Sequence, residues 1–209
     1  MLELYFVRHG ETEWNVENRL QGRLDSPLTE RGIKEARLLA ERLAQLPFKA
    51  AVSSPSTRAV ETAKILIGMR GIPLYTDERL MEIDLGDWQG KTKAEIRAAD
   101  PWNYECYYHY PHLYAREGSE RFLDVKKRVE GLLADLERRF SSGNLLVVSH
   151  GMVIKVVQQL ICKGLPVARL WDPPWIEGTS VTVVRAGGGK RELVVEGDIS
   201  HLENNGTKK

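Results

Sequence analysis

Two histidines stand in matching settings, because each ends a short apolar run and is followed directly by glycine. His9 comes after the run at 2–7, and His150 comes after the run at 145–149. Both runs are rich in residues that favour β-structure, so they predict strands. In open α/β sheets, ligands bind beyond the carboxyl ends of the strands, so both histidines are expected on one rim if the strands are neighbours. One histidine alone would favour a structural role, whereas the matched pair predicts a functional site.

Arg8, next to His9, indicates the chemistry of that site. Its guanidinium opposes a bound cation, and its planar fork matches two anionic oxygens of a phosphate. Zinc binding is the alternative, but the remaining histidines show no HExxH arrangement; they are His109, His112 and His201. We therefore expect an anionic substrate and no metal.

Glycines beside the two histidines support the same interpretation. Gly10 and Gly151 would let backbone amides approach the anion, and a helix beginning after His150 would direct its positive end toward it. Walker A and GxGxxG patterns are absent from the sequence, so no cofactor is expected.

Apolar runs and helical patterns alternate along the chain, which predicts a mostly parallel central sheet. Further strands are expected at 48–53 and 72–75, and a hairpin is expected at 181–196 around three glycines. The expected helices are 29–47 with Thr29 as N-cap, 55–68, 92–101 with a capping box of Thr92 and Glu95, 119–140 closed by Gly143, and one after His150. The predicted fold class is α/β, a three-layer sandwich with helices on both faces of the sheet.

The composition fits one globular domain with a large core. Of the 209 residues, 42% are hydrophobic and 28% are charged, and the formal net charge is +1. This balance gives no whole-surface attraction to nucleic acid or to an anionic membrane. Cys106 and Cys162 stand far apart, so no disulfide framework is expected, and we expect a cytoplasmic protein. The composition makes no prediction of the oligomeric state.

Residues 8–15, RHGETEWN, resemble the signature of the histidine phosphatase superfamily, the phosphoglycerate mutase-like proteins. Four further stretches follow in the family's order: 25–32, 53–63, 82–90 and 149–151. The resemblance covers nearly the whole chain and implies a phosphoglycerate mutase-like fold. It implies a single histidine phosphatase domain at 1–203, with an aromatic flap around 92–118 and a frayed tail at 204–209.

The resemblance implies that His9 is the nucleophile and forms a phosphohistidine intermediate. A nucleophilic imidazole must be neutral, and the cationic side chains of Arg8 and Arg58 disfavour its protonated form. Further residues that the resemblance places around the phosphoryl group are Asn15, Gln21, Gly22, His150 and Gly151. Arg58 has the alternative of an exposed helix arginine, and a polar loop would also explain Gln21 and Gly22.

By the same resemblance, Glu82 donates a proton to the leaving oxygen and then activates water. It lies among apolar residues, so a partly buried carboxyl is expected. The alternative is a structural ion pair with Arg79. Glu11 and Glu13 are expected to be supporting residues, since a carboxylate in the phosphate pocket would repel the substrate.

The interval between Glu82 and His150 bears on the reaction type. Mutases of this family are longer and carry an insertion there, whereas this interval is compact, and residues 102–114 include six Trp or Tyr. An aromatic wall would favour organic phosphate esters; a flap packed on the core is the alternative. We predict a broad-specificity phosphatase, a phosphoric monoester hydrolase acting on small organic phosphate esters.

Three other functions stay open at this point. They are a cofactor-dependent phosphoglycerate mutase, a more specialised phosphatase such as α-ribazole phosphatase, and a phosphate-binding regulator that has lost catalysis. The presence of both histidines, both arginines and Glu82 argues against the regulator.

Overall fold

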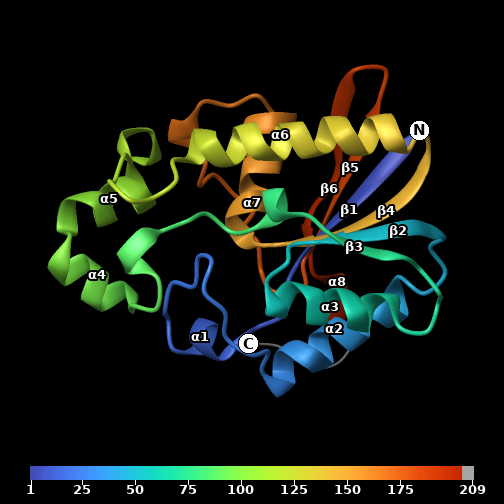
Figure 1. The fold of residues 1–209 in the computed structure, drawn as a ribbon, viewed down its shortest axis with the longest axis horizontal. Coiled ribbons are helices and arrows are strands. Elements are labelled where there is room, and N and C mark those ends of the chain that lie inside the picture. Colours follow the sequence, from blue (N-terminus) through green and yellow to red (C-terminus); the bar gives the residue numbers. More distant parts are fainter. Residues whose placement is uncertain (204–209) are drawn as a thin grey trace.

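Six strands form one sheet in the order β3-β2-β4-β1-β5-β6 (Figure 1). The computed structural model describes residues 1–203, so the tail expected at 204–209 lies outside the described residues. The strands are β1 (Leu2–Arg8), β2 (Phe48–Ser53), β3 (Leu74–Thr76), β4 (Gly143–Ser149), β5 (Val181–Gly187) and β6 (Lys190–Asp198). Strands β1 to β4 are parallel to one another, whereas β5 is antiparallel to β1 and forms an antiparallel hairpin with β6. The predicted mostly parallel sheet is therefore confirmed.

The register of β1 against β4 brings the two histidines together. Arg8 pairs with Ser149, so the two strands end at the same level. His9 and His150 are the next residues along each strand, and their ring centroids lie 5.2 Å apart. Strand β2 is parallel to β4 on its other edge, so the residues that follow β2 reach the same rim.

The helices begin where the sequence supplies a cap. Thr29 accepts a hydrogen bond from the amide of Gly32, and Thr92 and Glu95 form a capping box, both as predicted. The helices are α1 (Glu13–Val16), α2 (Glu30–Arg42), α3 (Thr57–Ile67), α4 (Lys93–Ala99), α5 (Pro101–His109), α6 (Phe122–Arg139), α7 (Gly151–Lys155) and α8 (Ser200–Glu203). A π-helical stretch, η4 (Val156–Cys162), continues α7.

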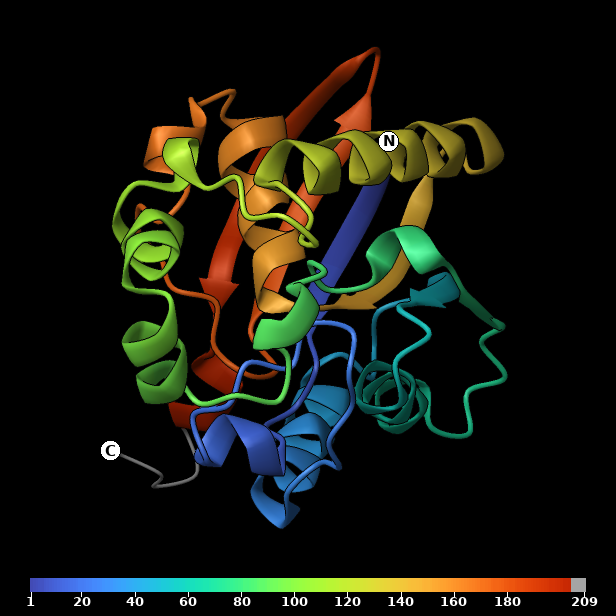
Figure 2. The same ribbon diagram turned by 60° about the vertical axis from the view of Figure 1, so that its left-hand side comes forward.

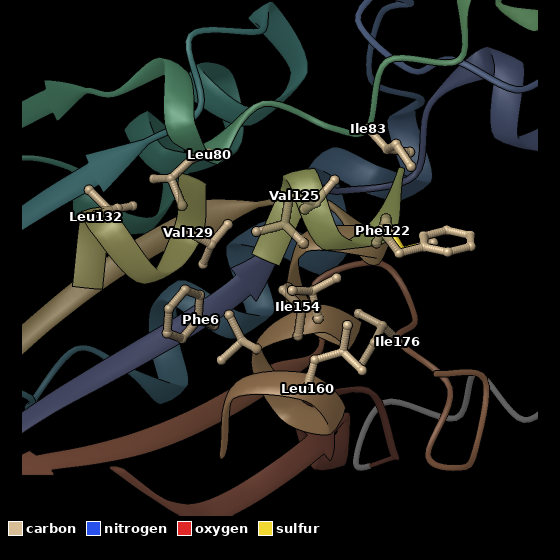
Figure 3. Close-up of a cluster of buried hydrophobic side chains, with 14 of the residues drawn as sticks. Phe6, Leu80, Ile83, Phe122, Val125, Val129, Leu132, Ile154, Leu160 and Ile176 are labelled. Atoms are coloured by element: carbon tan, nitrogen blue, oxygen red, sulfur yellow. The ribbon is translucent and has the colours of Figure 1, made fainter. Parts of the chain in front are cut away.

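Two hydrophobic clusters, one on each face of the sheet, form the core. On one face, Phe6 of β1 lies in a cluster with Val129 of α6 and Ile154 of α7 (Figure 3). On the other face, Leu39 of α2 and Ala59 of α3 belong to the second cluster. Figure 1 shows α6 on one side of the strands and α2 with α3 on the other. The three-layer sandwich follows from this arrangement.

Several local expectations differ from the structure. Helix α6 ends at Arg139, and Gly143, with φ of +95°, begins β4 instead of closing the helix. Strand β3 covers 74–76 rather than 72–75, and Pro101 begins α5 as well as limiting α4. The sequence does not predict helix α1, because its four residues are too few to show a helical period. These differences fall at element ends and in short elements, where local signals are weakest.

A close approach between the loop after β1 and the first turn of α2 requires glycine at position 32. A Cβ on Gly32 would clash with the carbonyl oxygen of Glu11 and lie 2.7 Å from its nitrogen. We expect Gly32→Ala to lower the free energy of unfolding by about 1–3 kcal/mol, as overpacked sites do. Gly131→Ala, on the exposed face of α6, is the matched control. It should raise the free energy of unfolding by about 0.4–1 kcal/mol. Urea unfolding measures both, and an unchanged Gly32→Ala protein would contradict the close approach.

Candidate active site

His9 is buried, with 3% of its surface exposed, and its two ring nitrogens have different partners. Nδ1 lies 2.7 Å from the carbonyl oxygen of Gly10, and Nε2 lies 3.3 Å from Nε of Arg58. A carbonyl oxygen only accepts and a guanidinium only donates, so Nδ1 carries the proton and Nε2 presents a lone pair. Burial lowers the pKa of His9 well below its usual value, and the charges of Arg58 and Arg8 lower it further. A neutral imidazole with this lone pair has the form that a nucleophile requires.

His150 is fully buried and has the opposite tautomer. Its Nδ1 lies 3.1 Å from Nη2 of Arg58 and therefore accepts a hydrogen bond. Its Nε2 lies 2.8 Å from Oγ of Ser54 and 3.2 Å from Oγ of Ser56, and donates to these hydroxyls. Burial lowers the pKa of His150 well below its usual value, and Arg58 adds to the effect. His150 is thus a neutral acceptor that holds one side of the Arg58 guanidinium, while two serines with no role predicted from the sequence hold His150.

Arg58 is 1% exposed, so the alternative of an exposed helix arginine is wrong. Besides the two histidines, its guanidinium donates to the carbonyl oxygens of Gly22 at 2.8 Å and Leu24 at 2.6 Å, and to the carboxylate of Asp25 at 2.8 Å. Within the described part of the chain, each of its three nitrogens therefore has an acceptor. The arrangement holds the loop at 22–25 against the two histidines.

Arg8 reaches the same rim from the end of β1. Its Nη1 donates to the carbonyl oxygen of Ile176 at 2.7 Å. Its Nε is buried and has no hydrogen-bond partner among the described residues. A Cβ on Gly151 would lie 3.6 Å from this Nε, so the glycine leaves space beside the guanidinium. A buried donor without a partner costs free energy, so Nε of Arg8 is a candidate ligand for an anionic oxygen.

Glu82 places a half-buried carboxyl beside the arginines. Its Oε1 accepts from the amide of Ile83 at 2.9 Å, and its Oε2 accepts from the amide of Met152 at 3.2 Å. The alternative partner Arg79 instead pairs with Asp77 at 2.8 Å. Burial raises the pKa of Glu82, and the two backbone hydrogen bonds oppose this in part. A raised pKa increases the protonated fraction, which is the form that a general acid needs.

A cavity of about 200 Å³ lies against these groups. The predicted residues that line it are Arg8, His9, Asn15, Gln21, Gly22, Arg58 and Glu82. Nε2 of Gln21 donates to Thr12 at 2.7 Å, and its Oε1 is buried without a partner among the described residues. Gly22 has φ of +52°, which favours glycine. Figure 2 shows the chain after β1 meeting the chain before α4 at this end of the sheet, where Leu20 and Gly90 are hydrogen-bonded.

The aromatic residues at 102–114 are divided between the cavity and the core. Tyr107 and Tyr108, in α5, line the cavity. Tyr107 also packs against Trp88 and Tyr114, with ring centroids 6.0 Å and 5.2 Å away. The segment is therefore both a wall of the cavity and a flap packed on the core. Lys93, at the start of α4, also lines the cavity and was not identified from the sequence.

The sequence predicts that backbone amides at Gly10 and at the start of the helix after His150 approach a bound anion. For Gly10 the prediction is wrong, and at the helix one amide binds a carboxylate of the protein instead. The amide of Gly10 donates to Oγ1 of Thr62 at 3.0 Å and is not free for an anion. Glycine is needed there because a Cβ would lie 2.8 Å from the carbonyl oxygen of Gly32. At the start of α7, the amide of Met152 donates to Glu82, so this end of the helix stabilises a carboxylate of the protein itself. Both pairings join residues far apart in the sequence, which local patterns do not reveal.

Within residues 1–203, no group of three or more His, Cys, Asp or Glu side chains is placed to hold a metal ion. In the same range, no helix has the length and apolar character needed to cross a membrane. Cys106 is buried and Cys162 is half-buried, and both are free thiols.

The opposite tautomers of His9 and His150 are a testable feature of the site. At about pH 6, we expect both rings to be neutral, with the proton of His9 on Nδ1 and that of His150 on Nε2. Because burial lowers both pKa values, each ring becomes protonated only when the pH falls well below 6.5. Long-range proton–nitrogen NMR on protein labelled at histidine measures the tautomers, and His9→Ala and His150→Ala assign the signals. An imidazolium signal from either ring at that pH would contradict this electrostatic arrangement.

Known proteins are similar to this chain in sequence and in fold. The chain matches the histidine phosphatase superfamily (branch 1) over residues 4–199. It is 32% identical over 172 residues to phosphoserine phosphatase 1 of Hydrogenobacter thermophilus, covering 82% of this chain and 81% of that one. It is 34% identical over 208 residues to phosphoglycerate mutase-like protein 4 of Arabidopsis thaliana, covering 98% and 88%. The structure of YhfR from Bacillus stearothermophilus matches with a TM-score of 0.93 and 47% identity, over 97% of this chain and 100% of that one. The chain therefore belongs to the histidine phosphatase superfamily, as the sequence resemblance implied.

Proposed function

We propose that this protein hydrolyses small organic phosphate monoesters through a phosphohistidine intermediate on His9. The observation that carries the proposal is the position of His9 Nε2, 3.3 Å from Nε of Arg58, at a cavity that Glu82 also lines. A nucleophile, positive charge for the phosphoryl oxygens and a carboxyl with a raised pKa thus lie together.

In the first step, Nε2 of His9 attacks phosphorus, and the bond between phosphorus and the ester oxygen breaks. Glu82 donates its proton to that oxygen, and the alcohol leaves. When the substrate enters, Nε of Arg58 exchanges its hydrogen bond to His9 for one to a phosphate oxygen, which frees the lone pair. The hydrogen bond from His9 Nδ1 to the Gly10 carbonyl stabilises the ring as it becomes positively charged.

In the second step, water attacks the phosphohistidine. Glu82, now a carboxylate, takes a proton from the water, the bond between Nε2 and phosphorus breaks, and inorganic phosphate leaves. The same carboxyl therefore acts first as an acid and then as a base.

The phosphate group would bind between Arg8 and Arg58, whose two positive charges match its two negative charges. Nε of Arg8, buried without a partner among the described residues, would donate to one phosphate oxygen. Asn15 and Gln21 line the cavity and would donate from their amide groups, and Gly22 leaves space in the loop beside them. His150 would act through Arg58, which it orients.

A small cavity and an aromatic wall support broad specificity for the alcohol. The volume of about 200 Å³ fits a phosphate and a small organic group. Tyr107 and Tyr108 offer ring surfaces, which contact many alcohols without selecting one.

We also propose that residues 1–203 act as one domain, since both core layers pack on one sheet. We propose further that the protein is cytoplasmic, a location that its two free thiols favour.

Variants at His9 and Glu82 test the proposed chemistry. His9→Ala should abolish turnover and acid-labile phosphate labelling, because the nucleophile is lost. Glu82→Gln should lower kcat/KM for alkyl phosphates about 10²–10⁴-fold, because the proton donor is lost. Phosphate release and radiolabel trapping measure these effects, and His112→Ala, at an exposed histidine, is the control. Labelling that persists in His9→Ala would refute the assignment of the nucleophile.

A substrate panel separates the remaining functions. We expect steady phosphate release from several monoesters, including phosphoserine and p-nitrophenyl phosphate, and we expect it to continue in the presence of a chelator. Interconversion of 2- and 3-phosphoglycerate without phosphate release would identify a mutase instead. Release from α-ribazole phosphate alone would identify a specialised phosphatase, and neither release nor labelling would identify a regulator.

A further inference from the structure

The segment 81–85 carries Glu82 and belongs to no helix or strand. Its backbone is held by contacts from the chain just before α6. The carboxylate of Glu120 accepts from the amide of Asp84 at 2.9 Å, and the amide of Glu120 donates to the carbonyl oxygen of Asp84 at 2.8 Å. Without a helix or strand ladder of its own, this segment depends on such contacts for its conformation.

Arg128 of α6 contacts one carbonyl oxygen within this segment and one in the turn just before it. Its Nη2 donates to the carbonyl oxygen of Glu82 at 3.2 Å, and its Nη1 donates to that of Arg79 at 2.7 Å. Its Nε and Nη2 also donate to the two carboxylate oxygens of Glu120, at 3.0 Å and 3.1 Å. The side chains of Arg128 and Glu120 are only 15% and 18% exposed, so water competes little with this paired arrangement.

Helix α6 is a firm support for Arg128. Val125 and Val129, on either side of Arg128 in the sequence, are buried in the core cluster that also contains Leu80 and Ile83 (Figure 3). These apolar contacts hold the flanks of the segment that carries Glu82. The hydrogen bond from Arg128 then restrains the peptide group of Glu82 itself.

We propose that Arg128, paired with Glu120, is a positioning residue for Glu82. It holds the backbone so that the carboxyl faces the oxygen that leaves from phosphorus. The proposal rests on the proposed function, in which Glu82 donates the proton. A general acid works only within hydrogen-bond reach of its target, so a small displacement of Glu82 weakens proton transfer. Arg128 is not among the described residues that line the cavity, so it acts through Glu82 rather than on the substrate.

A displaced Glu82 and a destabilised protein have different effects on the relative rates of alkyl and aryl phosphate esters. An alkyl alcohol is a poor leaving group and needs the proton from Glu82, whereas p-nitrophenolate leaves readily without it. Displacement of Glu82 therefore slows an alkyl ester more than an aryl ester. Partial unfolding would lower the rates of both in the same proportion.

The experiment compares kcat/KM for glycerol phosphate and p-nitrophenyl phosphate, because this constant reports phosphoryl transfer to His9 when that step is irreversible. In Arg128→Met, we expect the alkyl-to-aryl ratio to fall about 10–100-fold, less than complete loss of the acid would cause. Lys127→Met, at the adjacent exposed position of α6, should leave the ratio unchanged. Glu120→Gln should lower the alkyl-to-aryl ratio to a smaller extent. This variant replaces Arg128→Met in the experiment if urea unfolding shows that Arg128→Met does not fold.

The Glu82→Gln background completes the test. In a protein that already carries Glu82→Gln, Arg128→Met should not change the alkyl-to-aryl ratio further, because both residues affect the same proton transfer from position 82. Equal losses for both esters in Arg128→Met, or a further selective loss in the Glu82→Gln background, would overturn the positioning role. A wild-type protein that forms no phosphohistidine, or a Glu82→Gln protein with an unchanged ratio, would instead overturn the proposed function.

Discussion

The buried guanidinium of Arg58 constrains the whole candidate site. A charge taken out of water is tolerated only when its donors have acceptors, and here these come from two histidines and the loop at 22–25. The tautomers of His9 and His150, the conformation of the loop and the ends of two strands therefore depend on one another. A buried hydrogen-bond network of this kind acts as a unit, because the loss of one partner leaves a donor without an acceptor.

The same burial determines the protonation of the site. Removal from water penalises whichever form of a group is charged, so it lowers the pKa values of His9 and His150 and raises that of Glu82. One physical effect thus favours a neutral nucleophile and a protonated acid together. The positive charges of Arg8 and Arg58 lower the pKa of His9 further, and they match the charge of a phosphate ester.

The site residues differ in how firmly the fold supports them. His9 and His150 follow adjacent parallel strands, whose hydrogen-bond register leaves little freedom of position. Arg58 lies in the first turn of α3, which packs on the same sheet. Glu82 lies in an irregular segment and takes its position from neighbours, chiefly the backbone of α7 and side chains presented at and before α6. A side chain that must serve first as acid and then as base is therefore located by contacts outside its own segment.

Local patterns in the sequence predicted a mostly parallel sheet with helices on both faces, because apolar runs and helix caps are local signals. They placed His9 and His150 at strand ends, and the pairing of β1 with β4 in the structure brings the two rings together. Seven of the predicted site residues line the cavity, whereas Lys93 lines it without having been predicted. Three contacts appear only in the folded structure: the amide of Gly10 donates to Thr62, Ser54 and Ser56 hydrogen-bond to His150, and Arg128 donates to the carbonyl oxygen of Glu82. Each of these contacts joins residues far apart in the chain. Their geometry follows from how strands and helices pack, which no local pattern records.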